Sequence, residues 1–310
     1  MSTINTFLNI NTASGAENRL ISKIKEYLEE KNYDTYTDKC GNLIAKKGSG
    51  EKKAAVFTNV DAAGLIVTFI EDNGYVRVSP LGGIDFRSAL YAKISSEDGS
   101  VSGLLLPDAA DSAWFDRTYA SFGFSSGDEA KSHFSQGDII YFDSDAAFLK
   151  NGNMYAHGAG VKSCAAAMCD AAESVVAEDT ETVFIFCVQK ELGLRGAYQA
   201  AFSEEPDVSL VVEPYDGDRE GVKILDKTMT ASEEVTEKIE KAADACGVEL
   251  KRTVNVQSMS DASHVQSAGH GAKTGVLLMP TKNIGTVREQ VNAEKITNIS
   301  HVISEFLNNI

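Results

Sequence analysis

Hydrophobic residues follow different patterns in different parts of this chain, and the changes of pattern divide it into regions. Residues 16–31 have the apolar spacing of an amphipathic helix, with Ser14 as its expected N-cap. Residues 33–46 predict two strands joined by a turn, and residues 54–60 form a short apolar run that is typical of a buried strand. From about residue 65 to residue 149, short apolar segments alternate with turns, which indicates a small all-β region.

After residue 151, apolar strands alternate with helical segments. The expected elements, in order, are a helix over 162–177, a strand over 183–188, a helix near 198–202, a strand over 208–212, a helix over 232–245, strands over 248–256 and 274–279, and a helix over 293–307. Such βα alternation implies a mainly parallel sheet. We therefore predict an α/β domain made of residues 1–64 and 150–310, interrupted by a small β-rich domain over residues 65–149.

Within the β-rich region, residues 111–136 are polar and aromatic without a clear period, which predicts a loop-rich excursion. Trp114 and Phe115 lie in this excursion. They are candidates for contact with a partner, and a local packing role fits them equally well.

Polar side chains follow three of the expected strands. The strand at 183–188 leads into Lys190 and Glu191, the strand at 54–60 includes Asn59 and is followed by Asp61, and the strand at 208–212 is followed by Glu213. The carboxyl ends of parallel strands share one edge of a sheet, where α/β proteins build their sites. Taken alone, Lys190 and Glu191 fit a solvated strand end, but the convergence of three strand ends favours a functional site.

The composition excludes several other classes of function. The net charge is −16 and there is no cluster of Lys and Arg, which argues against nucleic acid or an anionic membrane as a partner. No apolar run approaches the ~20 residues of a membrane span, and the first residues lack the features of a signal peptide. The chain has 5 cysteines, an odd number without paired spacing, so we expect free thiols and a cytoplasmic location.

Six short segments, in order, resemble one known family. They are SGAEN at 14–18, DKCGNLIAKK at 38–47, LGGIDFR at 81–87, VQKELGLRGA at 188–197, SDASHV at 260–265 and LLMPTKNIGT at 277–286. Together they resemble family forty-two of the metallopeptidases, the glutamyl/leucyl-type aminopeptidases that form tetrahedral particles and were formerly described as endoglucanases. The resemblance implies a zinc-peptidase-like α/β domain, with an inserted β domain that forms dimers able to build a twelve-subunit shell.

In that family two zinc or cobalt ions activate a water molecule. Each ion takes one histidine and one terminal carboxylate, an aspartate bridges them, and a glutamate accepts the proton of the water. The resemblance places Asn59 and Gly285 at the two histidine positions and Gly158 near the bridging aspartate. Lys190 replaces the general base, and Ala62 replaces a further glutamate. Three carboxylates remain, and they are Asp61, Glu191 and Glu213.

This set of residues predicts the loss of metal chemistry. Two ions about 3.5–4 Å apart without a bridging ligand would repel each other, and a lysine with an ordinary pKa near ~10.4 cannot accept a proton from water. We expect no metal, with Lys190 instead forming ion pairs with Glu191 and Glu213. The favoured interpretation is a catalytically inactive homologue that keeps the scaffold for assembly or for binding a peptide or amino acid.

Other interpretations stay open. An active aminopeptidase with a remodelled site would use His157, Glu191 and Glu213 to hold one zinc ion, although a loop histidine more often points elsewhere. His264 and His270 are further candidate ligands, with surface or structural roles as the alternative. A hydrolase that uses Ser163 or Cys164 lacks a Ser-His-Asp arrangement that the spacing would support.

Overall fold

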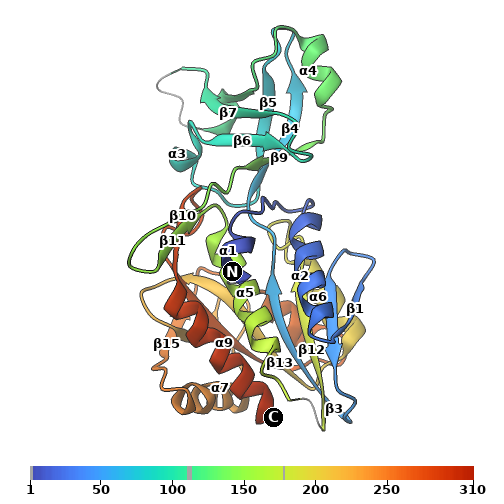
Figure 1. The fold of residues 1–310 in the computed structure, drawn as a ribbon, viewed down its shortest axis with the longest axis vertical. Coiled ribbons are helices and arrows are strands. Elements are labelled where there is room, and N and C mark those ends of the chain that lie inside the picture. The colour runs from blue at the N-terminus through green and yellow to red at the C-terminus, as the bar shows by residue number, and fades with distance from the viewer. Residues whose placement is uncertain (1–2, 110–113, 177–178) are drawn as a thin grey trace.

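The fold combines an eight-stranded sheet with a separate closed barrel. The computed structural model of the chain describes residues 3–109, 114–176 and 179–310. The strand order of the sheet is β1-β2-β12-β3-β13-β16-β14-β15, and the barrel lies beyond one end of the sheet (Figure 1). The sheet strands are β1 (Asp34–Thr37), β2 (Leu43–Lys47), β3 (Lys52–Asn59), β12 (Thr180–Cys187), β13 (Val208–Asp216), β14 (Gly221–Asp226), β15 (Lys251–Asn255) and β16 (Lys273–Thr281).

The centre of the sheet is parallel, as predicted. Strand β3 pairs in parallel with β12 on one side and with β13 on the other, and β13 pairs in parallel with β16. The pairs β1/β2, β2/β12 and β14/β16 are antiparallel, and β14/β15 is parallel. Segments before and after the barrel therefore belong to one sheet. The limits of the inserted domain at residues 65 and 149 stay a prediction.

Helices cover both faces of the sheet, because successive strand residues point to opposite sides. Val56 and Phe184 face one hydrophobic core, while Phe57 and Ile185 face the other. The first core is covered by α1 (Thr3–Phe7), α2 (Asn18–Glu30), α5 (Ala159–Ala172), α7 (Glu233–Ala245) and α9 (Ala293–Asn308). The second is covered by α6 (Arg195–Glu204) and α8 (Asp261–Ser267). Small residues let α5 pack closely against the sheet and beside α9 (Figure 1).

The barrel confirms the predicted inserted β domain. Its strands, in the order β4-β5-β8-β7-β6-β9, pair antiparallel throughout. They are β4 (Gly64–Ile70), β5 (Val76–Leu81), β6 (Lys93–Ser96), β7 (Ser102–Pro107), β8 (Thr118–Ser121) and β9 (Ile139–Phe142). Helix α3 (Phe86–Ala89) follows β5, and a small sheet of β10 (Ala147–Phe148), β11 (Asn153–Ala156) and β17 (Glu289–Asn292) lies between the barrel and the larger sheet.

Two local predictions were wrong. The stretch at 114–136 contains the short helix η1 (Phe115–Arg117), strand β8 and helix α4 (Gly127–His133), although residues 111–113 lie outside the described part. Phe115 packs edge-on against Phe86, with ring centroids 5.1 Å apart, whereas Trp114 is 72% exposed. Helix α2 does not start from Ser14, which is buried; Glu17 holds the N-cap position without a side-chain cap.

No helix in the described ranges has both the length and the apolar character needed to cross a membrane.

Candidate functional site

The strand ends named by the sequence meet at one edge of the sheet. Asn59 ends β3, Glu213 lies in β13, and Lys190 follows β12. The Lys190 Nζ donates to Asn59 Oδ1 at 3.4 Å and lies 3.8 Å from Glu213 Oε2. The backbone N–H of Glu191 donates to Asp61 Oδ2 at 2.9 Å. The five predicted side chains are thus brought together, although Glu213 is inside its strand and not at its end.

An unusual loop after β12 presents Lys190 and Glu191. Gln189 and Leu194 flank it with φ values of 57° and 60°, a left-handed conformation that is uncommon for residues other than glycine. The Glu191 carboxylate reaches across to the insertion, where its Oε2 accepts from the backbone N–H of Gly83 at 2.8 Å. Glu191 therefore links the loop to the segment that follows β5, and its carboxylate does not pair with Lys190.

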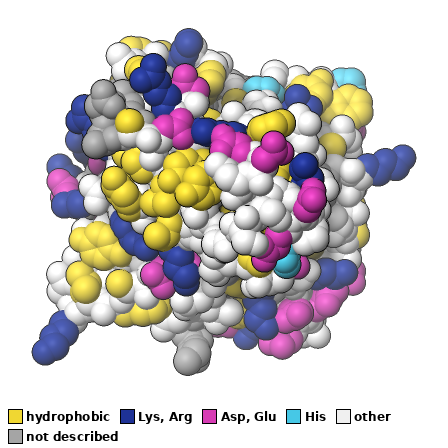
Figure 2. Space-filling view, turned by 90° about the horizontal axis from the view of Figure 1, so that it is seen from above, with side chains coloured by type: hydrophobic (Ala, Val, Ile, Leu, Met, Phe, Trp, Pro, Cys, Tyr) yellow, Lys and Arg dark blue, Asp and Glu magenta, His cyan; other side chains and the backbone are white. Residues whose placement is uncertain are grey.

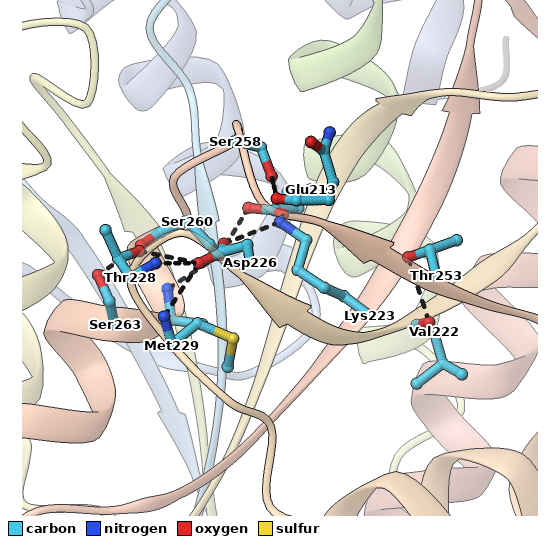
Figure 3. Close-up of polar contacts among 12 residues, drawn as sticks. Glu213, Val222, Lys223, Asp226, Thr228, Met229, Thr253, Ser258, Ser260 and Ser263 are labelled. Atoms are coloured by element: carbon cyan, nitrogen blue, oxygen red, sulfur yellow. Dashed lines mark hydrogen bonds and ion pairs between the residues drawn. The ribbon is translucent and has the colours of Figure 1, made fainter.

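The nearest cation to Glu213 is Lys223, which the sequence interpretation missed. Its Nζ contacts Glu213 Oε1 directly and lies 3.2 Å from Asp226 Oδ2 (Figure 3). The second oxygen of Glu213 accepts from Ser260 Oγ at 2.8 Å, and Asp226 accepts from the backbone N–H groups of Thr228 and Met229. All three charged side chains are buried, and each has an oppositely charged partner in direct contact. Glu213 therefore pairs mainly with Lys223, and the expected ion pair with Lys190 is the longer of its two contacts with a lysine.

Asp261 is a fourth carboxylate near Lys190, in addition to Asp61, Glu191 and Glu213. It begins α8, is 2% exposed, and its Oδ1 has no hydrogen-bond partner in the described chain. Burial raises the pKa of Asp261 to about 7; Lys190 lowers it, and Asp61 and Glu213 raise it further. Burial lowers the pKa of Lys190, but the carboxylates, Asp261 foremost, raise it more, so that it lies above its ordinary value. In the sequence, Asp261 could be noticed only because it lies in SDASHV at 260–265, one of the six segments that resemble the family.

His157 and Gly158 lie at the start of α5. The His157 Nε2 is 2.7 Å from the carbonyl oxygen of Ala63, and its ring packs against Phe142 of the barrel. Burial lowers the pKa of His157 to about 4, so that the ring is neutral at physiological pH. Gly158 holds the N-cap position of α5 with φ 63°. His157 thus binds a backbone carbonyl and does not meet Glu191 or Glu213.

Two more buried charges lie beneath these residues, and neither was predicted. Glu289 accepts from the backbone N–H of Gly160 at 2.9 Å and from that of Gly285 at 3.1 Å, which ties the loop before β17 to α5. Lys162 Nζ donates to Ser144 Oγ at 2.6 Å and to the carbonyl of His157 at 2.8 Å. Burial lowers the pKa of Lys162 to about 7, and Glu289 acts in the opposite direction.

The remaining candidates lie away from this edge or are inaccessible. His264 contacts Ser263 and the ring of Tyr198, and His270 is exposed. Ser163 and Cys164 are completely buried in α5, and burial raises the pKa of the Cys164 thiol. A buried thiol with a raised pKa is a poor nucleophile.

The donor set does not fit a pair of divalent ions. Within the described ranges, no three His, Cys, Asp or Glu side chains are arranged to hold a metal. Both oxygens of Glu213 are taken by Lys223 and Ser260, and the Lys190 ammonium lies beside them. A cation next to the only remaining ligands disfavours a second cation, because like charges repel strongly in a buried site.

Two cavities adjoin Lys190. The first has a volume of about 160 Å³; its polar lining residues include Asn59, Asp61, Glu191 and Glu289, and apolar residues such as Ala62, Val161 and Ile284 line the rest. The second has a volume of about 290 Å³, and its apolar lining residues are Pro214, Tyr215, Met259, Leu278 and Ile284. Lys190, Pro214 and Ile284 line both.

Comparison with known proteins agrees with this architecture. The model of the family described as M42 glutamyl aminopeptidase matches residues 41–302. Lysyl aminopeptidase of Pyrococcus furiosus is 27% identical over 287 residues, which cover 84% of this chain and 83% of that protein.

Solved structures share the fold. Aminopeptidase APDkam598 from the archaeon Desulfurococcus kamchatkensis superimposes with a TM-score of 0.93 at 23% identity, over 99% of this chain and 94% of that one. The TET1 peptidase of Pyrococcus horikoshii, which can assemble into a tetrahedron or a large octahedral shell, gives 0.91 at 22% identity over 99% of both chains.

Proposed function

Because this chain belongs to the M42 glutamyl aminopeptidase family, we propose that it keeps the family's scaffold but binds a peptide or amino acid at Lys190 without metal-dependent hydrolysis. The observation that carries the proposal is the Lys190 ammonium beside Asn59 and Glu213, at the junction of two cavities.

The chemistry of Lys190 supports a binding role. A general base must accept a proton from water, and its best pKa is near the working pH. The pKa of Lys190 is raised above its ordinary value, so the side chain is protonated and positively charged at neutral pH. A permanent cation binds an anionic or carbonyl oxygen well, but it cannot act as a base.

We also propose that the protein forms a homo-oligomer through the barrel. The insertion exposes several large hydrophobic side chains, Phe69, Tyr91, Leu104 and Trp114. Viewed from the barrel end, hydrophobic side chains gather among charged groups of both signs (Figure 2). Apolar groups gathered on an exposed surface often mark a protein interface. A strict monomer in sedimentation at micromolar concentration would contradict this part of the proposal.

The test of the main proposal is metal content together with peptidase activity. We expect the purified protein to contain far less than one zinc per chain, and to leave aminoacyl chromogenic substrates uncleaved with or without added zinc or cobalt. Lys190→Glu restores the acidic residue of the family segment, and we expect it to remain inactive because Asn59 and Gly285 still provide no imidazole. Near-stoichiometric zinc, or cleavage that a chelator abolishes, would overturn the proposal in favour of a one-zinc enzyme.

A further inference from the structure

Lys190 has hydrogen-bonding capacity that the protein does not fill. An ammonium group has three N–H donors, and its bonds to charged oxygens are normally about 2.7–2.9 Å long. Within the described chain, Lys190 Nζ has one hydrogen bond of 3.4 Å to Asn59 and one ion pair of 3.8 Å to Glu213. The side chain is 17% exposed, so a ligand can reach it. Lys190 can therefore donate further hydrogen bonds to an oxygen atom of a ligand.

The two cavities beside Lys190 differ in character. In the first, Glu191 Oε2 is bound to Gly83, and no hydrogen-bond partner is recorded for its Oε1 among the described residues. Asp61 lines the same cavity, which thus has negative charge to receive a cation. The second cavity offers more apolar than polar surface, along Tyr215, Met259 and Leu278, and the charged residues Glu213, Asp216 and Lys223 also line it. A ligand whose anionic group binds Lys190, between the two cavities, can thus place a cationic group in the first cavity and an apolar group in the second.

We propose that this site binds a free α-amino acid with an apolar side chain, whose carboxylate accepts hydrogen bonds from Lys190. The ammonium of the amino acid enters the first cavity toward Glu191 and Asp61, and its side chain fills the second cavity. This inference rests on the proposed binding function and narrows it. A free carboxylate is favoured over the carbonyl of a peptide because it has a full negative charge, which attracts the Lys190 ammonium in addition to accepting its hydrogen bonds.

The direct test is calorimetric titration of the whole protein with four matched probes. L-leucine has all three groups, leucinamide lacks the carboxylate, 4-methylpentanoate lacks the amine, and L-glutamate replaces the apolar side chain with a charge. We expect leucine to bind about tenfold more tightly than each of the others, which corresponds to about 1.4 kcal/mol. Equal affinity for leucine and leucinamide, or no binding of leucine, would overturn the inference.

Variants assign the effect to Lys190. Lys190→Met should reduce leucine affinity about tenfold or more and remove the preference over leucinamide, whereas Lys190→Arg should keep part of that preference. Lys282→Met is the matched control, because Lys282 is exposed, pairs with Asp218 and lines neither cavity. If Lys190→Met does not fold, the four-probe comparison on the natural chain decides the question alone.

The two proposals fail in different ways. Chelator-sensitive cleavage of a leucyl substrate would overturn the proposed function itself. A metal-free, inactive protein that binds a leucyl peptide as tightly as leucine would leave the proposed function in place and overturn only the preference for free amino acids.

Discussion

Two buried lysines, Lys223 and Lys162, show opposite ways of placing a cation inside this fold. Lys223 contacts the carboxylates of Glu213 and Asp226 (Figure 3). Among the residues that the structure describes, the Lys162 Nζ contacts only neutral oxygens, the Ser144 hydroxyl and the His157 carbonyl. Both side chains are nearly inaccessible to solvent.

The difference shows how the surroundings decide whether a buried charge is permanent. A buried charge is costly unless it is paired, and an unpaired group responds by shifting its pKa toward the neutral form. Burial lowers the pKa of Lys162 to about 7, so this lysine exchanges between its charged and neutral forms near neutral pH. Lys223 instead completes an ion cluster whose carboxylates depend on it.

The largest expected effect is therefore that of removing Lys223. Lys223→Met should lower the free energy of unfolding by ~3–5 kcal/mol, because Glu213 and Asp226 would remain buried without their nearest cation. Urea denaturation measures the change. Lys282→Met, which removes an exposed lysine, should stay within about 0.5 kcal/mol of the natural protein. A loss below about 1 kcal/mol for Lys223→Met would show that water reaches this cluster.

Lys162 should make the free energy of unfolding depend on pH. Its pKa in the folded protein is about 7, below the ordinary 10.5, so the unfolded chain binds more protons between these values. Folding stability due to Lys162 must then rise with pH, by about 2 kcal/mol from about pH 7 to about pH 9. Lys162→Met lacks this rise.

The measurement is the difference in unfolding free energy between the natural protein and Lys162→Met across that range. Titrating groups that do not interact with Lys162 contribute equally to both proteins and cancel; the exceptions are His157 and Glu289, because Lys162 lowers the pKa of each. A difference that is constant with pH, or one that moves in favour of Lys162→Met as pH rises, would contradict the assignment.

A smaller effect is expected at Ser260. Its Oγ accepts from the backbone N–H of Ala262 at 3.1 Å as the N-cap of α8, and donates to Glu213. Ser260→Ala should cost about 1 kcal/mol in a thermal or urea unfolding experiment. Ser232 has the same position before α7 but makes no side-chain cap bond, so Ser232→Ala is the control and should cost much less. Equal losses in both variants would show that the hydrogen bonds of the Ser260 side chain to Ala262 and Glu213 do not stabilise the protein.

Parts of the fold with uninterrupted apolar runs could be predicted from the sequence. Strands β3, β12 and β16 have such runs, and together with β13 they form the parallel centre of the sheet. Strand β14 was missed because Lys223 and Asp226 interrupt its apolar pattern, and only the folded chain shows that they pair. Strand β8 was missed because only 4 residues form it, within a polar stretch.

The same limit applies to the candidate site. Asn59, Asp61 and Lys190 could be found because they follow apolar strands whose ends meet at one edge. Asp261 and Lys162 come from helices, and the periodicity of a helix rich in small residues does not show that a charged side chain faces inward. Their burial depends on neighbours that are distant in sequence, such as Ser144 for Lys162.

The position of β3 between β12 and β13 also has a consequence for the order of events during synthesis. Strand β3 ends at Asn59, and its neighbour β12 begins at Thr180, so roughly 120 residues separate them. At about 5–20 residues per second, the ribosome needs on the order of ten seconds to supply that neighbour. The barrel strands are made within this interval and pair only among themselves. We expect the barrel to fold before β12 is made. The apolar residues of β3 then stay unpaired for several seconds, the period in which a chaperone would bind this nascent segment.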